Sequence, residues 1–300
     1  MPSSVIRTGP EVAAKLSDTA QMLRARMEGL DRPSVGLALG SGAARGLAHI
    51  GVLKALLANA IAIDVMVGCS IGAVVGGCYA AGVEPDQMED IARSIDKRIV
   101  FRHLDFAVPN RGGLIAGARV SDLLKELTMN KTFGQLRIGF ACTAADIHTG
   151  EEVVLETGVL HEAIRASLSI PGVFQPVVMG SRVLVDGGIV NPIPANYLVA
   201  MGVDVVIGVD VTPELIPSER DIGKPPSIVF TLINAFDIMA RVVSEPTADI
   251  VDVMIRPDVG RVFGGDFWLA DELIERGWEA TQEQIPRIKE AIREASRRPR

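Results

Sequence analysis

Short apolar runs alternate with longer amphipathic segments between residue 35 and about residue 255. A short apolar run bounded by turn residues predicts a buried strand, whereas apolar residues three and four apart predict a helix. Strands are expected at 35–39, 61–67, 138–145, 152–155, 182–186, 203–211 and 251–255. Helices are expected at 10–30, 47–59, 73–81, 85–98, 121–129, 160–168, 228–243 and 278–298. This alternation predicts an α/β fold around a mostly parallel sheet.

Residues 65–83 carry no charge, and a stretch of this length could span a membrane as a helix. The stretch contains five glycines and Ser70, so a buried strand followed by a buried helix explains it better. The apolar seam of residues 10–30 predicts packing on the protein's own core or on a second subunit. A membrane-facing helix is the alternative, because Lys15, Arg24 and Arg26 are basic.

Ser70 lies in the sequence Gly-Cys-Ser-Ile-Gly at residues 68–72, directly after an apolar run and before a helix of small residues. This order is typical of a nucleophile elbow, in which a tight turn between strand and helix presents a reactive serine. Gly68 and Gly72 leave room for the turn and for close packing of the strand against the helix. Ser70 is therefore the candidate nucleophile.

A second loop of small residues, Gly-Ser-Gly-Ala-Ala-Arg-Gly at 40–46, follows the strand expected at 35–39. Backbone N–H groups in such a loop suit an anion, for example the oxyanion that forms when a serine attacks an ester. Dinucleotide binding is disfavoured because Arg45 stands where that fingerprint needs its third glycine. A Walker A loop is excluded because no Gly-Lys-Ser/Thr triplet occurs. A plain turn between strand and helix is the structural alternative.

A serine needs a base to take its proton, and the histidines of the chain are weak candidates. None occupies the late position of the histidine in an α/β-hydrolase, so a structural role is expected for His49, His103, His148 and His161. Asp186 is the better candidate, because it ends an apolar strand and is followed by Gly187 and Gly188. It is expected at the carboxyl edge of the sheet, where burial would raise the pKa of its carboxyl group. The alternative is an ordinary Asp-Gly turn.

The chain resembles the patatin-like phospholipase family in three motifs that follow one another in the family's order. These are the loop at 40–46, the elbow at 68–72 and the Asp-Gly-Gly sequence at 186–188. The flanking sequences at 45–53, 166–177 and 186–194 are also similar to the family. The resemblance covers residues 35–211, and the chain most resembles the compact bacterial members.

The resemblance implies a three-layer α/β/α sandwich with a mostly parallel central sheet, and a Ser–Asp dyad that hydrolyses acyl esters of lipids. By position, Ser70 is the nucleophile and Asp186 the base, and the amides of Gly42 and Ala43 are the oxyanion donors. The chain departs from the glycine-richest form of the loop at Ser41 and Ala43. The Ala43 amide is expected to keep its role provided that φ is negative there. Arg45 matches a basic position of the family and is expected to order the loop. The supporting motif glycines are Gly40, Gly46, Gly68, Gly72, Gly187 and Gly188.

No cofactor or metal ion is expected, because the family needs neither histidine nor calcium and the sequence has no evident cluster of metal ligands. The net charge of −7 disfavours nucleic acid as a partner. The three cysteines lie in apolar surroundings and no secretory signal is evident, which favours a cytoplasmic protein. The expected partner is an acyl-lipid substrate, which is compatible with transient contact with a membrane surface. The sequence does not decide whether the protein forms a homo-oligomer.

Three parts are expected along the chain: an N-terminal tail and amphipathic helix at 1–34, a patatin-like catalytic domain at 35–211, and a C-terminal extension at 212–300 packed on the same core. Residues 101–119 contain several glycines and a proline, and they are expected to form a long loop or lid. The expected function is hydrolysis of carboxylic esters in (lyso)phospholipids or related acyl lipids. The alternatives are a catalytically weak acyl-lipid-binding or regulatory protein and an acyltransferase with the same dyad.

Overall fold

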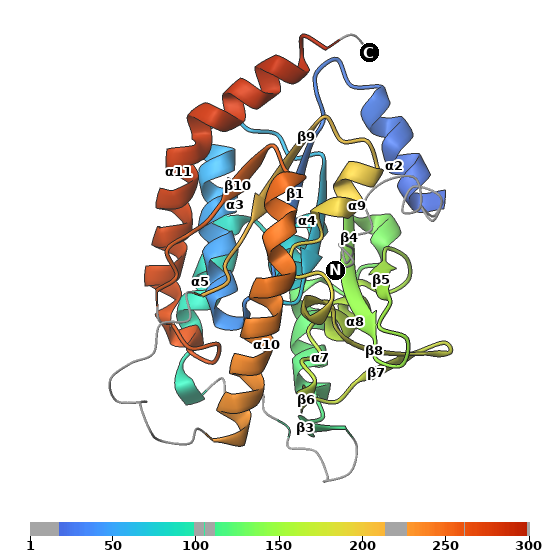
Figure 1. Ribbon diagram of the computed structural model, residues 1–300, viewed down its shortest axis with the longest axis vertical. Coiled ribbons are helices and arrows are strands. Elements are labelled where there is room, and N and C mark those ends of the chain that lie inside the picture. The colour runs from blue at the N-terminus through green and yellow to red at the C-terminus, as the bar shows by residue number, and fades with distance from the viewer. Residues whose placement is uncertain (1–17, 99–104, 106–111, 214–226, 261, 299–300) are drawn as a thin grey trace, which may run out of the picture.

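A mixed β-sheet runs through the centre of the molecule in the computed structural model, which describes residues 18–98, 105, 112–213, 227–260 and 262–298 (Figure 1). Within these residues the sheet has eight strands. In spatial order, seven of them are β10 (Val253–Ile255), β9 (Val205–Val209), β1 (Val35–Leu39), β2 (Val65–Cys69), β4 (Gly139–Asp146), β8 (Arg182–Asp186) and β7 (Val177–Met179). The eighth, β5 (Glu152–Leu155), pairs with β4.

The strands from β10 to β4 run parallel to one another, whereas β8, β7 and β5 are antiparallel to their neighbours. Every residue of β1, β2 and β9 is buried, as apolar strands are when helices cover both faces of a sheet. The mostly parallel sheet predicted from the sequence is therefore confirmed. Asp186 pairs with Ala144 near the carboxyl end of β4, at the edge expected from the sequence, but β8 reaches this edge from the opposite direction.

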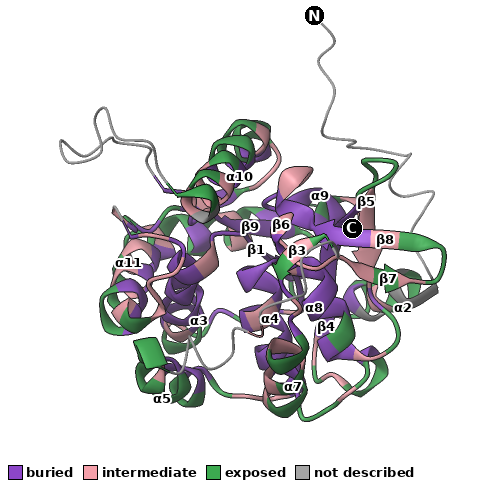
Figure 2. Ribbon diagram, turned by 90° about the horizontal axis from the view of Figure 1, so that it is seen from below, coloured by how far each residue is buried: buried purple, intermediate pink, exposed green. Residues whose placement is uncertain are grey.

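Helices cover both faces of the sheet and complete three α/β/α layers (Figure 2). Side chains along β1 alternate between the two faces. Leu37 and Leu39 belong to the larger core, which they share with α3 (Ala48–Ala58), α4 (Ile71–Ala81), α8 (Leu160–Ser167) and α11 (Ala270–Ala295). Ala38 packs on the other face with α9 (Ala195–Ala200) and α2 (Asp18–Glu28). The predicted three-layer sandwich is confirmed.

The described part of the predicted N-terminal helix is α2, which packs on the protein's own core. Met27 is buried, and Leu23 and Leu30 pack beside it against the face of the sheet that α9 also covers. The part of this prediction before residue 18 lies outside the described residues. The charge-free stretch at 65–83 forms β2 and α4, and within the described ranges no helix combines the length and apolar character needed to cross a membrane.

Two long helices, α10 (Ile228–Ser244) and α11, complete the C-terminal part of the fold. α11 begins at Ala270 rather than at residue 278, because Leu273 and Ile274 pack into the core beside α3. α11 and α3 cross so closely that a Cβ on Gly51 of α3 would lie 1.9 Å from the Ile274 carbonyl oxygen. α10 lies apart from this pair, along the front of the molecule in Figure 1.

The loop predicted at 101–119 contains regular structure in its described part. β3 (Gly113–Ile115) pairs with β6 (Gly172–Phe174) in a small second sheet. α7 (Ala118–Leu127) begins three residues before the helix expected at 121–129, and Asp105 accepts hydrogen bonds of 2.8 Å from the amides of Gly117 and Ala118 at its start. Residues 99–104 and 106–111 of this segment, and 214–226 of the loop predicted before α10, lie outside the described residues. A lid at 101–119 stays a prediction.

Candidate active site

Ser70 stands at the turn between β2 and α4, and its backbone conformation is strained. It has φ 55° and ψ −121°, a region that residues other than glycine rarely adopt. Two glycines make this turn possible. A Cβ on Gly68 would lie 2.4 Å from the Gly72 carbonyl oxygen, and one on Gly72 would lie 2.2 Å from the Leu39 carbonyl oxygen. The turn therefore fixes Ser70 where β2, α4 and β1 meet.

We expect Gly72→Ala to destabilise the protein strongly, because the added methyl group would meet backbone atoms of β1 that cannot move aside. Overpacking against backbone should lower the free energy of unfolding by about 3 kcal/mol. The matched control is Gly134→Ala, where a Cβ would meet no atom within 4 Å. Urea denaturation of both variants measures the difference, and equal stabilities would contradict this close packing.

The structure brings Ser70 and Asp186 together, with the Ser70 Oγ donating a hydrogen bond of 2.6 Å to Asp186 Oδ2. The register of the sheet explains the match. Cys69 of β2 pairs with Thr143 of β4, and the next residue of β4, Ala144, pairs with Asp186 of β8. Ser70 and Asp186 therefore lie level with each other across β4, although β8 runs antiparallel.

Asp186 is completely buried, and burial raises the pKa of its carboxyl group from 3.8 to about 7. Hydrogen bonds from the Ser70 hydroxyl, the Gly188 amide and the Cys69 thiol lower this pKa and offset only part of the effect of burial. The Gly188 amide lies 2.9 Å from Oδ1, and the Cys69 Sγ lies 3.8 Å from the same oxygen. A carboxyl group with a pKa near neutrality can accept a proton and return it at physiological pH.

Two further serines, which the sequence did not single out, hold the backbone of this pair. Ser167 Oγ accepts a hydrogen bond of 2.9 Å from the Ser70 amide and donates one of 2.7 Å to the Thr143 carbonyl. The Ser169 carbonyl accepts a hydrogen bond of 2.9 Å from the Asp186 amide. Both serines lie in the Ala-Ser-Leu-Ser sequence at 166–169, which is part of a segment that resembles the family. Nothing in the sequence itself assigns a role to either serine.

The loop at 40–46 leads from β1 through a 3-10 helix (Ala43–Leu47) into α3, and two of its amides are unpaired within the described ranges. Four flanking amides donate hydrogen bonds of 2.9–3.1 Å to carbonyl oxygens: those of Gly40, Ser41, Ala44 and Arg45. Among the described residues, the amides of Gly42 and Ala43 donate none. Gly46 packs against Ile71 at the start of α4, so the loop contacts the elbow directly. Two adjacent unpaired amides at such a place can stabilise an oxyanion.

The conformation of Ala43 differs from the expectation of a negative φ, because its φ is 49°. An alanine in this left-handed region costs roughly 1 kcal/mol more than a glycine. The loop imposes the strain, since the next amide, that of Ala44, is bound to the Gly264 carbonyl at 3.0 Å. The expected sign of φ was wrong, but the Ala43 amide is still unpaired within the described residues.

Arg45 is buried beneath the loop, and its guanidinium bonds groups from three parts of the chain. Nε donates to the Gly42 carbonyl at 3.1 Å, Nη1 to the Val262 carbonyl at 3.2 Å, and Nη2 to Asp237 Oδ1 at 2.5 Å. Asp237 lies on α10, in a region where the sequence indicated no chemistry. The sequence feature that could have identified Asp237 is that it is the one acidic residue in the apolar segment Ile228–Ser244.

The three described histidines take no part in the contact between Ser70 and Asp186. His49 is fully buried, and its Nε2 donates a hydrogen bond of 2.8 Å to the Gly40 carbonyl. Burial lowers the pKa of His49 to about 4, so the ring is neutral at physiological pH and supports the loop. No hydrogen bond joins His148 or His161 to Ser70 in the described part of the chain, and His103 lies outside it.

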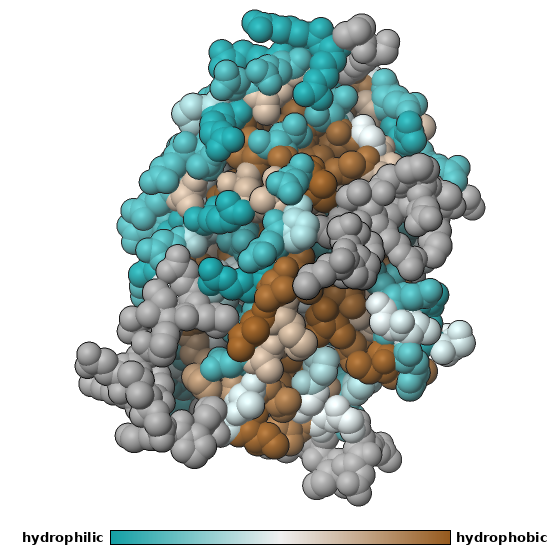
Figure 3. All heavy atoms as spheres, viewed as in Figure 1, coloured by the Kyte–Doolittle hydropathy of each residue, from teal (hydrophilic) through white to brown (hydrophobic). Residues whose placement is uncertain are grey.

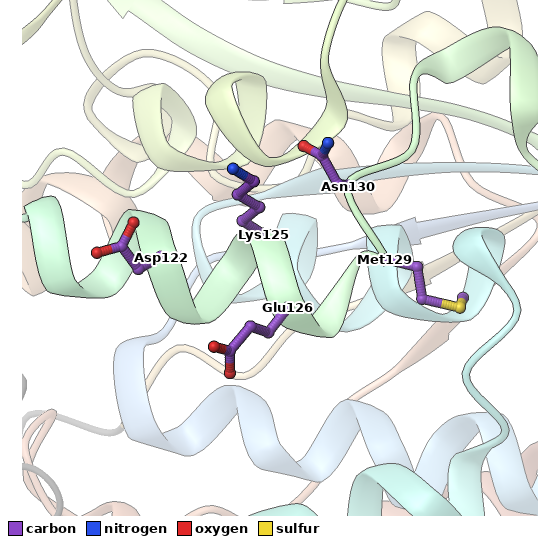
Figure 4. Close-up of a pocket in the computed structure, with 5 residues that line it drawn as sticks. All are labelled: Asp122, Lys125, Glu126, Met129 and Asn130. Atoms are coloured by element: carbon purple, nitrogen blue, oxygen red, sulfur yellow. The ribbon is translucent and has the colours of Figure 1, made fainter.

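No group of three or more His, Cys, Asp or Glu side chains within the described ranges is placed to hold a metal ion. A hollow of about 560 Å³ beside α7 is lined by Asp122, Lys125, Glu126, Met129 and Asn130. In Figure 4 Lys125 and Glu126 leave α7 in different directions and do not converge on a common point. None of the candidate site residues lines this hollow, and its charged lining is unsuited to an acyl chain.

Comparison with known proteins supplies the family. The family model described as patatin-like phospholipase matches residues 37–199, and the chain belongs to this family. An NTE family protein of Mycobacterium tuberculosis is 39% identical over 184 residues, which cover 61% of this chain and 51% of the relative. A second protein of that organism and family is 30% identical over 287 residues, covering 87% of this chain and 48% of the relative.

More distant proteins share parts of this similarity. Lysophospholipase nte1 of Emericella nidulans is 26% identical over 285 residues, covering 85% of this chain and 18% of that protein. The crystal structure of VipD from Legionella pneumophila matches with a TM-score of 0.51 at 13% identity, over 86% of this chain and 67% of VipD. At this identity the match concerns the fold alone. The chain spans about half the length of the mycobacterial relatives.

Proposed function

We propose that this protein hydrolyses carboxylic esters of acyl lipids, with Ser70 as nucleophile and Asp186 as base. The hydrogen bond of 2.6 Å between Ser70 Oγ and Asp186 Oδ2 is the observation that carries the proposal. It joins a serine in a strained turn to a buried carboxyl group whose pKa is raised to about 7. The amides of Gly42 and Ala43, which have no partner among the described residues, and membership of the patatin-like phospholipase family support the same chemistry.

The proposed reaction has two steps that use the same groups. Ser70 Oγ attacks the ester carbonyl while Asp186 takes its proton, and the Gly42 and Ala43 amides stabilise the oxyanion. Asp186 then gives this proton to the alcohol that leaves, and an acyl-enzyme remains. Water attacks the acyl-enzyme with Asp186 again as base, which releases the fatty acid and restores the Ser70 hydroxyl. The proposed steps use no metal ion, because the loop amides stabilise the negative charge that develops on the carbonyl oxygen of the substrate.

A lipid substrate is supported by the two sides of α10. Its inner side packs on the site, with Phe236 against Gly188 and Leu232 against Gly172. Its outer side carries exposed apolar side chains, which contribute to the brown surface along α10 in Figure 3. These are Ile228, Ile238, Met239 and Val242, with exposed fractions of 72%, 50%, 46% and 63%. A helix that covers the site and is apolar towards solvent suits contact with the lipid aggregate that supplies the substrate.

We expect the double variant Ile238→Ser/Val242→Ser to hydrolyse phospholipid vesicles roughly tenfold more slowly than wild type, because two aliphatic contacts with lipid are lost. Hydrolysis of a soluble p-nitrophenyl ester should not change. The matched control is Ile91→Ser, on the exposed side of α5 (Pro85–Ser94), which should leave both rates unchanged. A double variant as active as wild type on vesicles would contradict lipid contact through α10.

The proposed function is tested by the products formed from phosphatidylcholine and lysophosphatidylcholine vesicles, with Ser70→Ala as the inactive control. Free fatty acid as the main product supports hydrolysis. If an added acceptor alcohol gives a new ester and no free fatty acid is formed, the activity is acyl transfer rather than hydrolysis. A folded protein that binds the lipid but forms neither product would contradict an enzymatic role.

A further inference from the structure

The peptide between Gly42 and Ala43 has its orientation set by Arg45. A trans peptide is planar, so the Gly42 carbonyl oxygen and the Ala43 N–H point in opposite directions. Arg45 holds the carbonyl twice, through its backbone amide at 3.1 Å and through Nε at 3.1 Å. The Ala43 N–H is therefore turned away from Arg45 and is left without a partner among the described residues.

The Arg45 side chain is in turn held by groups that come from far along the chain. Nη2 donates to Asp237 Oδ1 at 2.5 Å, and Nη1 donates to the Val262 carbonyl at 3.2 Å. The side chains of Arg45 and Asp237 are only 2% and 9% exposed, so water cannot replace either partner. Loss of one charge from such a buried pair forces the other to find a new arrangement.

We propose that Asp237 is a positioning residue for ester hydrolysis, which fixes the Arg45 guanidinium and thereby keeps the Ala43 amide turned towards the oxyanion. The inference rests on the proposed function, because the amide matters for rate only when Ser70 forms an oxyanion. Asp237 acts through Arg45 and touches no reacting atom. It lies outside the residues matched by the family model, 37–199, so α10 completes the site from a separate part of the chain.

Asp237→Asn tests this role, because it removes the charge and keeps the size of the side chain. We expect kcat for a soluble p-nitrophenyl ester to fall roughly 10- to 100-fold. This decrease is no larger than the decrease in kcat expected when one oxyanion donor is removed completely. KM should change less than about threefold, since the oxyanion exists only in the transition state. The midpoint of the pH profile should stay near 7, because the surroundings of Asp186 are unchanged.

The matched control is Glu89→Gln, which removes another buried carboxylate from ion pairs. Glu89 lies on α5 and pairs with Lys54 and Arg93, whose other ion pairs among the described residues are to Asp86 and Asp271, outside the site. This variant should lose stability and keep the kcat of wild type. Asp237→Glu restores the charge on a longer side chain, so it should recover only part of the lost kcat and stay several-fold below wild type. All rates are normalised to active sites titrated with a fluorophosphonate.

The outcomes separate the inference from the proposed function. A kcat of wild-type size in folded Asp237→Asn, or a change in KM or melting temperature alone, overturns the positioning role and leaves the proposed function intact. If Asp237→Asn does not fold, Asp237→Glu decides: a kcat several-fold below wild type at unchanged KM supports the role, and a wild-type kcat overturns it. A wild-type protein that neither hydrolyses esters nor reacts with the fluorophosphonate contradicts both.

Discussion

Ser70→Ala is expected to lower kcat for ester hydrolysis by at least about a thousandfold. The variant lacks the oxygen that attacks the carbonyl, so residual activity can come only from the oxyanion amides acting on water. The fold should be kept, because the Ser70 amide can still donate to Ser167 Oγ and the side chain loses one hydrogen bond, to Asp186. The free energy of unfolding should change by no more than about 1 kcal/mol.

Steady-state kinetics and urea denaturation of the same preparations measure both effects. Ser296→Ala is the control, because this serine follows α11 and its hydroxyl donates only a local hydrogen bond to the Ile292 carbonyl. It should retain full activity. A folded Ser70→Ala protein with activity close to that of wild type would exclude Ser70 as the nucleophile.

Asp186→Asn is expected to lower kcat by orders of magnitude, because an amide cannot take the Ser70 proton. In the wild-type protein, kcat/KM should rise with pH and level off above a midpoint near 7, where the buried Asp186 carboxyl loses its proton. Below this midpoint the rate should fall about tenfold per pH unit. Asp86→Asn, which removes an exposed carboxylate, should keep the wild-type profile. A flat wild-type profile between pH values on either side of 7 would speak against Asp186 as base.

The same pKa predicts a gain of stability in Asp186→Asn. The carboxyl pKa is about 7 in the folded protein and 3.8 in the unfolded chain, so between these values the folded state binds the extra proton. Stability of wild type therefore falls as pH rises through this window, and the penalty is complete above the folded pKa. The neutral amide of the variant would carry no such penalty. The stability of the variant relative to wild type should be greater at pH 8 than at pH 5 by roughly 3 kcal/mol.

Urea denaturation of both proteins at the two pH values measures this difference. The two effects together, lost activity and gained stability at high pH, are expected for a buried functional carboxylate. A stability difference that is the same at both pH values would mean that Asp186 is not protonated in the folded state near neutrality.

Local sequence was sufficient to predict the parts of the site that are formed by neighbouring residues. The elbow at Ser70 depends on an apolar run, two glycines and a small-residue helix, all within about twenty positions. The end of an apolar strand before two glycines likewise indicated Asp186 and its place near the edge of the sheet. The direction of β8 was not predictable, because residue periodicity shows that a segment is a strand but not which neighbour it pairs with.

The parts that sequence reasoning missed depend on contacts between distant segments. Asp237 is 192 positions from Arg45, and an isolated acidic residue in an apolar helix has no motif. The positive φ of Ala43 follows from a loop held by Gly264 and Val262, and no local pattern places these residues beside it. The division of the chain at residues 34 and 211 stays a prediction, and the Arg45–Asp237 ion pair crosses the second boundary.

Reaction of the protein with a fluorophosphonate, followed by peptide mass spectrometry, is the sharpest test of Ser70 as nucleophile and Asp186 as base. We expect a single adduct on Ser70 in wild type, formed faster as pH rises through 7, none in Ser70→Ala, and much slower labelling in Asp186→Asn. An adduct on a different residue, or a folded wild-type protein that stays unlabelled, would contradict a Ser70–Asp186 dyad.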